Sequence, residues 1–208
     1  MDIPGQILQF LFPEPCCHCG QGPALCGWLL CGDCRPSLRL RPRELDGGGM
    51  VRQAWFLAPY NGPVGSLVRR TKYRPDPAMM ARLAGLLAGS LPALPPVCAV
   101  VHVPTSARRR MRRGFDQAAV LAEAAARRMD RPHRFLLRRH DPGEQAGRSP
   151  AARKAGLSFR FSARGQVPRE ILLVDDVRTT GSTLDACAMA LLGAGCRSVY
   201  AVVLASAG

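Results

Sequence analysis

The sequence predicts an α/β protein built on a parallel sheet, with a small cysteine-rich module at its N-terminal end. From Trp55 onward, short β-branched runs alternate with segments of helical spacing, a pattern typical of parallel sheets with right-handed crossovers. Six of the nine cysteines lie between Cys16 and Cys34, in a segment rich in Gly and Pro. We therefore expect two units: a metal-binding module with its linker at residues 1–46, and the α/β domain at residues 47–208.

The expected elements of the α/β domain follow in order along the chain. Apolar, β-branched runs predict strands near Trp55 and over residues 97–104, 134–140, 170–176 and 198–205. Helical spacing predicts helices from Pro63, over 77–91, over 114–129 with Asp116 as N-cap, and over 182–195. Residues 35–50 contain a triple glycine and are expected to form a linker, and the polar, basic residues 141–156 a mobile loop.

Composition points to an anionic partner. The chain has 208 residues, 47% of them hydrophobic, which is enough for one domain and an accessory module. A net charge of +14 suits nucleic acid or a phosphorylated small molecule, although scattered surface arginines would give the same total. The N-terminal stretch lacks a basic n-region, and no window approaches the about 20 apolar residues of a membrane span. We expect a cytoplasmic protein without membrane insertion.

Two CxxC pairs indicate a zinc site. Cys16 and Cys19 form the first pair and Cys31 and Cys34 the second, with 11 residues between the pairs. Four thiolates at this spacing can close a tetrahedral structural Zn²⁺ site, and a reducing compartment favours metal over disulfides. Free thiols without metal are the alternative. The rival ligands are Cys17, His18 and Cys26.

The stretch ILLVDDVRTTGSTL, residues 171–184, combines acids and hydroxyls. Its apolar strand ends in Asp175 and Asp176, at the edge where open α/β sheets bind ligands. Gly181 can adopt positive φ, and a helix begins directly after it, so that the backbone N–H groups and hydroxyls suit a phosphate monoester. The carboxylates would accept hydrogen bonds from sugar hydroxyls or help to hold Mg²⁺. A ribose 5-phosphate supplies both groups.

Other interpretations of this stretch fit less well. The chain has neither a P-loop signature nor a GxGxxG turn after the strand. An acidic phosphoacceptor site would explain the carboxylates but not the run of hydroxyls. An Asp and Thr pair that merely caps a helix is the remaining alternative.

The stretch resembles the 5-phosphoribosyl 1-diphosphate (PRPP) motif of the type I phosphoribosyltransferases. This resemblance implies that Asp175 and Asp176 contact the ribose hydroxyls. It also implies a 5-phosphate loop of Arg178, Thr179, Thr180, Gly181, Ser182 and Thr183.

Three further segments narrow the resemblance: FLAPYNGPVGSLVRRTKYRPD, VVHVPTSARRRMRRGFDQAAVLA and the CxxC pairs. Together they resemble the ComF competence family over nearly the whole chain, from Cys16 to Ala205. The resemblance implies a zinc module joined to a phosphoribosyltransferase domain, with a link in some bacteria to the uptake of transforming DNA.

The resemblance also implies further site residues. Lys72 would reach the diphosphate, and Gln145 and Arg153 would lie in a catalytic flexible loop. Asp116 stands where the family has Asn, which keeps a capping role but removes an amide donor. The pyrophosphate loop would consist of Thr105, Ser106, Ala107 and Arg108, with Arg109 adding charge, although a basic solvated turn would have the same composition.

The implied chemistry is displacement of diphosphate from C1 of PRPP by a nucleophile. Mg²⁺ and the basic loops would stabilise the leaving diphosphate, and Asp176 would act as general base or stabilise the cationic ribosyl centre. The alternative is a non-enzymatic competence factor with PRPP as regulatory ligand. That factor would bind single-stranded DNA or a DNA-uptake or recombination protein. The sequence does not name an acceptor.

Overall fold

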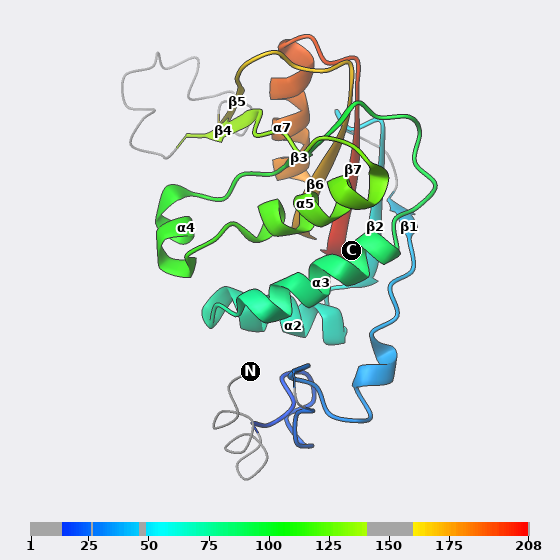
Figure 1. Cartoon of the computed structure of the whole chain (residues 1–208), viewed down its shortest axis with the longest axis vertical. Helices are drawn as coiled ribbons and strands as arrows, with labels where there is room; N and C mark the ends of the chain where they lie inside the picture. Colours follow the sequence, from blue (N-terminus) through cyan, green and yellow to red (C-terminus); the bar gives the residue numbers. More distant parts are fainter. Residues whose placement is uncertain (1–13, 26, 46–48, 141–159, 208) are drawn as a thin grey trace.

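A five-stranded, mostly parallel sheet forms the centre of the molecule (Figure 1). The computed structural model describes residues 14–25, 27–45, 49–140 and 160–207. The strand order is β1-β2-β7-β6-β3, with β1 antiparallel at the edge and the other four strands parallel. The strands span Arg43–Leu45 (β1), Gln53–Pro59 (β2), Ala99–His102 (β3), Glu170–Arg178 (β6) and Ser198–Ser206 (β7).

Helices cover both faces of this sheet (Figure 1). One face packs against α2 (Pro63–Tyr73), α3 (Pro77–Gly89) and α5 (Gln117–Met129). The other packs against α7 (Ser182–Gly193) and a hairpin of β4 (Leu137–Arg139) and β5 (Phe161–Ala163). The short helix α4 (Ala107–Arg113) has no buried residue, and the 3-10 turn η1 (Arg35–Ser37) follows the cysteines.

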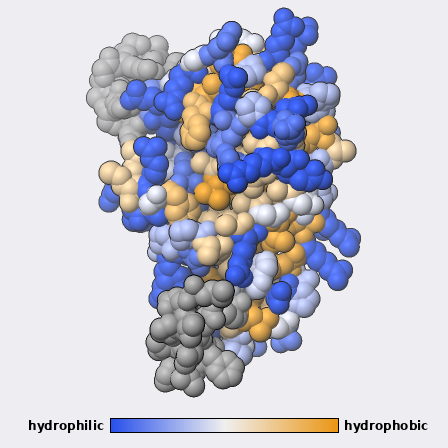
Figure 2. Space-filling view, in the orientation of Figure 1, coloured by the Kyte–Doolittle hydropathy of each residue, from blue (hydrophilic) through white to orange (hydrophobic). Residues whose placement is uncertain are grey.

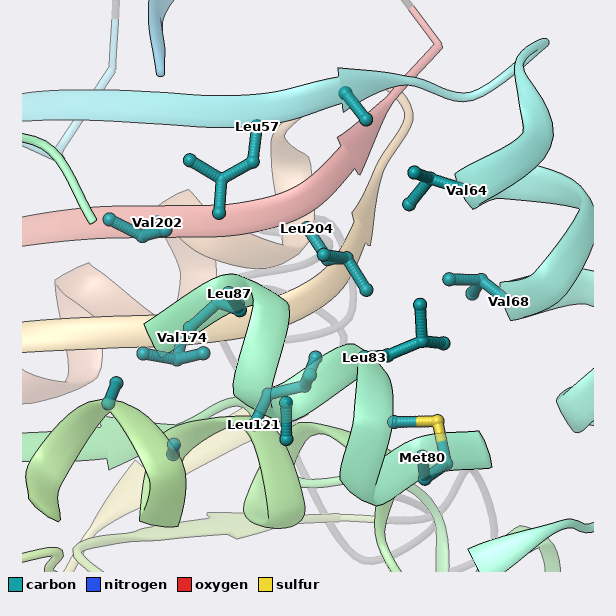
Figure 3. Packing of buried hydrophobic residues seen from close by; sticks show 14 of the residues in the cluster. Leu57, Val64, Val68, Met80, Leu83, Leu87, Leu121, Val174, Val202 and Leu204 are labelled. Atoms are coloured by element: carbon teal, nitrogen blue, oxygen red, sulfur yellow. The ribbon is translucent and has the colours of Figure 1, made fainter. Parts of the chain in front are cut away.

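Strand alternation divides the core into two clusters. On β6, Leu172 and Val174 belong to the cluster on the side of α2, α3 and α5, whereas Ile171 and Leu173 belong to the cluster beneath α7. This division follows from the two-residue period of a strand, which sends successive side chains to opposite faces. Figure 3 shows Val174 close to helix residues of the first cluster. Both faces of β6 are therefore apolar from Ile171 to Val174, and its two aspartates follow at the C-terminal end.

The predicted fold class, α/β with a mostly parallel sheet, is confirmed. The helix expected over 114–129 begins at Gln117, because the side chain of Asp116 caps it by accepting a hydrogen bond from Ala118 N. The division at residue 46 stays a prediction. The segment 141–156 lies outside the described residues.

Three elements were not expected from the sequence. The linker prediction for residues 35–50 is wrong for β1, which pairs with β2 and extends the sheet. Helix α4 forms where only a loop was expected, since Ser106 caps its start and Gly114 ends it in the left-handed conformation. Because α4 buries nothing, it has no apolar periodicity. The third element, β5, has only three residues.

Hydrophilic residues cover much of the face seen in Figure 2, with hydrophobic ones scattered among them. Within the described part of the chain, none of the helices combines the length and the apolar character needed to cross a membrane.

Candidate functional site

A cavity of about 370 Å³ lies at the carboxyl edge of the sheet. Loops after β3 and β6, the last turn of α2 and residues of α4 and β4 line it. Parallel strands bring these loops together, since their carboxyl ends meet at one edge. Seven of the predicted site residues line the cavity: Lys72, Thr105, Arg109, Asp175, Asp176, Thr179 and Thr183.

The remaining predicted residues fall into two groups. Gln145 and Arg153 lie outside the described residues. The others flank the cavity on its two loops without lining it: Ser106, Ala107, Arg108, Arg178, Thr180, Gly181 and Ser182.

The two carboxylates at the end of β6 differ in environment. Asp176 Oδ2 forms an ion pair with Lys72 Nζ at 2.8 Å. Asp175 Oδ1 instead accepts a hydrogen bond from the backbone N–H of Asp176 at 2.8 Å. Burial, and then the negative charge of Asp176, raise the pKa of Asp175 well above its ordinary value. The pair thus offers one carboxylate that is ion-paired with a lysine and one that favours its neutral form.

The hydroxyl loop forms the predicted turn into α7. Gly181 has φ of +83° at the N-cap, so the expectation of positive φ is confirmed. A Cβ here would also lie 3.0 Å from Nε of Arg178. Thr180 Oγ1 and Ser182 Oγ are hydrogen-bonded at 2.9 Å, which fixes the hydroxyls beside the helix N-terminus. This arrangement suits a phosphate, because hydroxyls, N–H groups and the positive helix end converge.

Asp116 ties the loop after β3 to α5. Its Oδ2 accepts a hydrogen bond from Thr105 N at 2.9 Å, and its Oδ1 accepts one from Ala118 N at 3.1 Å. Both oxygens accept, so this position needs no amide donor and Asp serves as well as Asn. Burial raises the pKa of Asp116, against the effect of these N–H groups.

Sequence reasoning missed three cavity residues, Tyr60, Arg112 and Arg139. Arg112 could have been found had α4 been recognised, because residues 109, 112 and 113 share one helical face and all line the cavity. Arg139 enters from the β4–β5 hairpin, and Tyr60 follows β2; neither carries a local signal for this site.

Arg113 occupies an unusual position in the cavity wall. Its Nη1 donates to Gln117 Oε1 at 3.3 Å, and Gln117 Nε2 donates to the buried Thr71 Oγ1 at 2.9 Å. Among the described residues, Arg113 Nε is buried without a hydrogen-bond partner. Burial lowers the pKa of Arg113, which reflects the cost of holding this cation away from water.

The four cysteines of the two CxxC pairs converge on one point. Their sulfur atoms all lie within 4.8 Å of one another, and Cys19 Sγ and Cys31 Sγ are 3.7 Å apart. A tetrahedral Zn²⁺ site with Zn–S bonds of about 2.3 Å requires sulfur separations of about 3.8 Å. The cluster can therefore hold a metal ion such as zinc through Cys16, Cys19, Cys31 and Cys34.

The rival ligands are otherwise engaged or not described. His18 Nδ1 is hydrogen-bonded to Ser66 Oγ of α2 at 3.0 Å. Burial raises the pKa of Cys17 to about 11, and its thiol does not belong to the group of four converging sulfur atoms. Cys26 lies outside the described residues.

The cysteine cluster docks on α2 and α3. Leu30 is fully buried in the same core cluster as Leu67 and Leu83. An ion pair of 2.7 Å joins Glu14 to Arg70 of α2. The metal site is thus part of the core packing.

Comparison with solved structures finds structural neighbours of low sequence identity. An α/β parallel-sheet protein with an N-terminal four-cysteine cluster, as described above, has phosphoribosyltransferases among its structural neighbours. A glutamine PRPP amidotransferase from B. subtilis, complexed with ADP and GMP, aligns with 60% of this chain and 25% of its own at 21% identity and a TM-score of 0.45. Adenine phosphoribosyltransferase from Leishmania donovani aligns with 79% of this chain and 86% of its own, at 13% identity and a TM-score of 0.39.

Comparison of sequences gives the particular relatives. Competence protein F of Haemophilus influenzae is 29% identical over 74% of this chain and 75% of its own. Competence protein ComFC of Bacillus subtilis is 27% identical over 86% of this chain and 72% of its own. DNA utilization protein YhgH of Salmonella typhi is 29% identical over 90% of this chain and 94% of its own. The chain is a homologue of the ComF/ComFC competence proteins, which confirms the resemblance found in its motifs. No protein-family model matches it.

Proposed function

We propose that the chain is a PRPP-binding protein of ComF type that acts in DNA uptake or DNA use. One observation carries the PRPP proposal: an acidic pair and the first turn of a phosphate-type loop line the same cavity as five cations. These cations are Lys72, Arg109, Arg112, Arg113 and Arg139. The names of the relatives support the second half of the proposal.

Each part of PRPP has a complementary part of the site. The 5-phosphate binds at the start of α7, where Thr179 and Thr183 line the cavity. Asp175 and Asp176 accept hydrogen bonds from the ribose hydroxyls. The diphosphate lies beside the loop of residues 105–108, within reach of the arginines of α4.

The chemistry follows from these positions if the bound PRPP reacts. A nucleophile forms a bond to C1, the C1–O bond breaks, and the diphosphate leaves with the electron pair. Asp176 accepts the proton that the nucleophile loses. Gln145 and Arg153 keep their predicted catalytic role in this proposal.

The remaining sequence-based predictions are part of the same proposal. The ion in the cysteine cluster is Zn²⁺, held by Cys16, Cys19, Cys31 and Cys34 in a structural role. The cysteine cluster suits a reducing compartment, and we place the protein in the cytoplasm.

Calorimetric titration with PRPP tests the proposal. We expect saturable binding that falls by about tenfold or more in Asp176→Ala and Thr183→Ala, because each removes a ligand contact. Arg128→Gln, an exposed change on α5 outside the cavity, is the control and should bind normally. Absence of heat and of a thermal shift with wild-type protein at saturating PRPP would refute PRPP binding.

A second candidate function, binding of single-stranded DNA, is favoured by α4. This helix carries five arginines in seven residues, buries none of them, and has Met111 77% exposed. Arg108 and Arg110 do not line the cavity, so a nucleic acid on this outer face would leave the PRPP site open. The two functions are compatible.

A further inference from the structure

The carboxylates of the PRPP cavity are already engaged. Both oxygens of Asp116 accept backbone N–H groups, Asp176 Oδ2 faces Lys72 Nζ, and Asp175 Oδ1 accepts a backbone N–H. Mg²⁺ requires oxygen ligands in near-octahedral geometry, and in proteins it is bound by ionised carboxylates together with substrate phosphates. Both oxygens of Asp116 are taken, and Lys72 Nζ already places a positive charge at Asp176, where it repels a second cation. The donor groups of this cavity therefore do not fit the Mg²⁺ that the family resemblance implies.

Lys72 places a positive charge beside Asp176 in the cavity, where a divalent cation would otherwise neutralise the ligand's phosphates. Its side chain is 25% exposed and that of Asp176 13% exposed, so the pair lies at the cavity wall and is shielded from bulk water. The last turn of α2 is fixed in place, since the neighbouring Thr71 is fully buried and receives a hydrogen bond from Gln117. An ammonium group has three donors, and only one is needed for Asp176. The others can bind a phosphoryl oxygen.

Four arginines line the cavity together with Lys72 and add to its positive charge. Residues 109, 112 and 113 lie on one face of α4, and Arg139 approaches from β4. The guanidinium of Arg113 is positioned by Gln117, and its buried Nε has no partner among the described residues. An anion in the cavity would offset the cost of keeping this cation partly desolvated. Guanidinium groups bind a diphosphate in a bidentate manner, which a point charge cannot do.

We propose that Lys72 and the cavity arginines supply the positive charge that a divalent cation would otherwise supply, so that the protein binds PRPP without Mg²⁺. This inference rests on the proposed function and departs from the Mg²⁺ dependence expected from the sequence. Lys72 is a binding residue in it: on PRPP entry it keeps its ion pair with Asp176 and contacts the diphosphate.

Paired calorimetric titrations test this inference. PRPP is titrated into the full chain with millimolar Mg²⁺ and, separately, with EDTA, at matched ionic strength so that screening is equal. For wild-type protein we expect dissociation constants that agree within about threefold. Lys72→Gln should bind about tenfold more weakly in EDTA and regain affinity when Mg²⁺ is added, because the ion replaces the lost charge.

Two further variants serve as controls. Lys72→Arg keeps the charge and should retain binding in EDTA, and Arg128→Gln removes a charge outside the cavity and should behave as wild type. The two titrations of wild-type protein, one with Mg²⁺ and one with EDTA, decide the outcome even if Lys72→Gln does not fold. Binding with Mg²⁺ but not with EDTA overturns this inference and leaves the proposed function intact. No binding under either condition refutes the proposed function itself.

Discussion

Asp175 and Asp176 are adjacent, yet the fold gives them opposite electrostatic roles. Asp176 gains Lys72 as a partner, whereas Asp175 gains only a backbone N–H and a negative neighbour. The folded protein therefore favours a protonated Asp175, and the pKa of this carboxyl is raised. Such a group weakens folding as the pH rises, because the folded state binds a proton that the unfolded chain releases.

We predict that Asp175→Asn stabilises the ligand-free protein at neutral pH. The amide cannot ionise, so the gain should grow as the pH rises above the ordinary carboxyl pKa of about 3.9 and vanish below it. Thermal unfolding across pH values measures this difference. An unchanged or lowered midpoint for Asp175→Asn at neutral pH would contradict the prediction.

At the scale of elements, two short segments determine the sites: the β6–α7 turn and the pair of cysteine knuckles. Both depend on local conformations that their sequences specify, positive φ at Gly181 and the CxxC spacing. Each is then held by packing, the turn beneath α7 and the knuckles against α2 and α3. Their loss should therefore affect stability as well as ligand binding.

Gly181→Ala should destabilise the protein by about 1 kcal/mol or more, since a Cβ is strained at positive φ. It should also weaken PRPP binding. Urea unfolding measures the first effect. Gly85→Ala in α3, where a Cβ meets nothing within 4 Å, should instead stabilise by roughly 0.5–1 kcal/mol. Equal effects of the two changes would argue against the role of positive φ.

Cys31→Ser should abolish metal binding and lower the thermal midpoint by on the order of 5–10 °C, because a buried ligand and its docked module are lost together. Zinc content per chain, determined by elemental analysis, and thermal unfolding measure the two effects. Cys98→Ser changes an exposed thiol far from the cluster and should keep the metal. Retention of a full complement of zinc by Cys31→Ser would exclude this ligand assignment.

At the scale of the whole molecule, the net charge of +14 includes two groups of cations around α4. Part of it lines the cavity and part lies on the outer face of α4. The first group suits a small phosphorylated ligand, and the second a polyanion. Salt dependence separates these two uses of charge.

Binding of single-stranded DNA should weaken with salt, with a slope that reflects the number of phosphate contacts. Arg110→Gln should reduce that slope by about 0.7 and leave PRPP affinity unchanged, because Arg110 does not line the cavity. Fluorescence anisotropy over a range of salt concentrations measures the slope. An unaltered slope would remove α4 from the DNA contact, and absence of binding at low salt would refute direct DNA binding.

The sequence by itself determined the local features. The apolar run before Asp175, the glycine turn after it and the cysteine spacing each involve neighbouring residues, so pattern and propensity predict them. Only the tertiary structure decided which distant side chains join them. The Lys72–Asp176 pair, the entry of Arg139 and the choice of Cys16 over Cys17 depend on how helices and strands pack, and packing is a property of the whole chain. Arginines that bury nothing leave no periodic signal, so their assignment to the cavity required the fold.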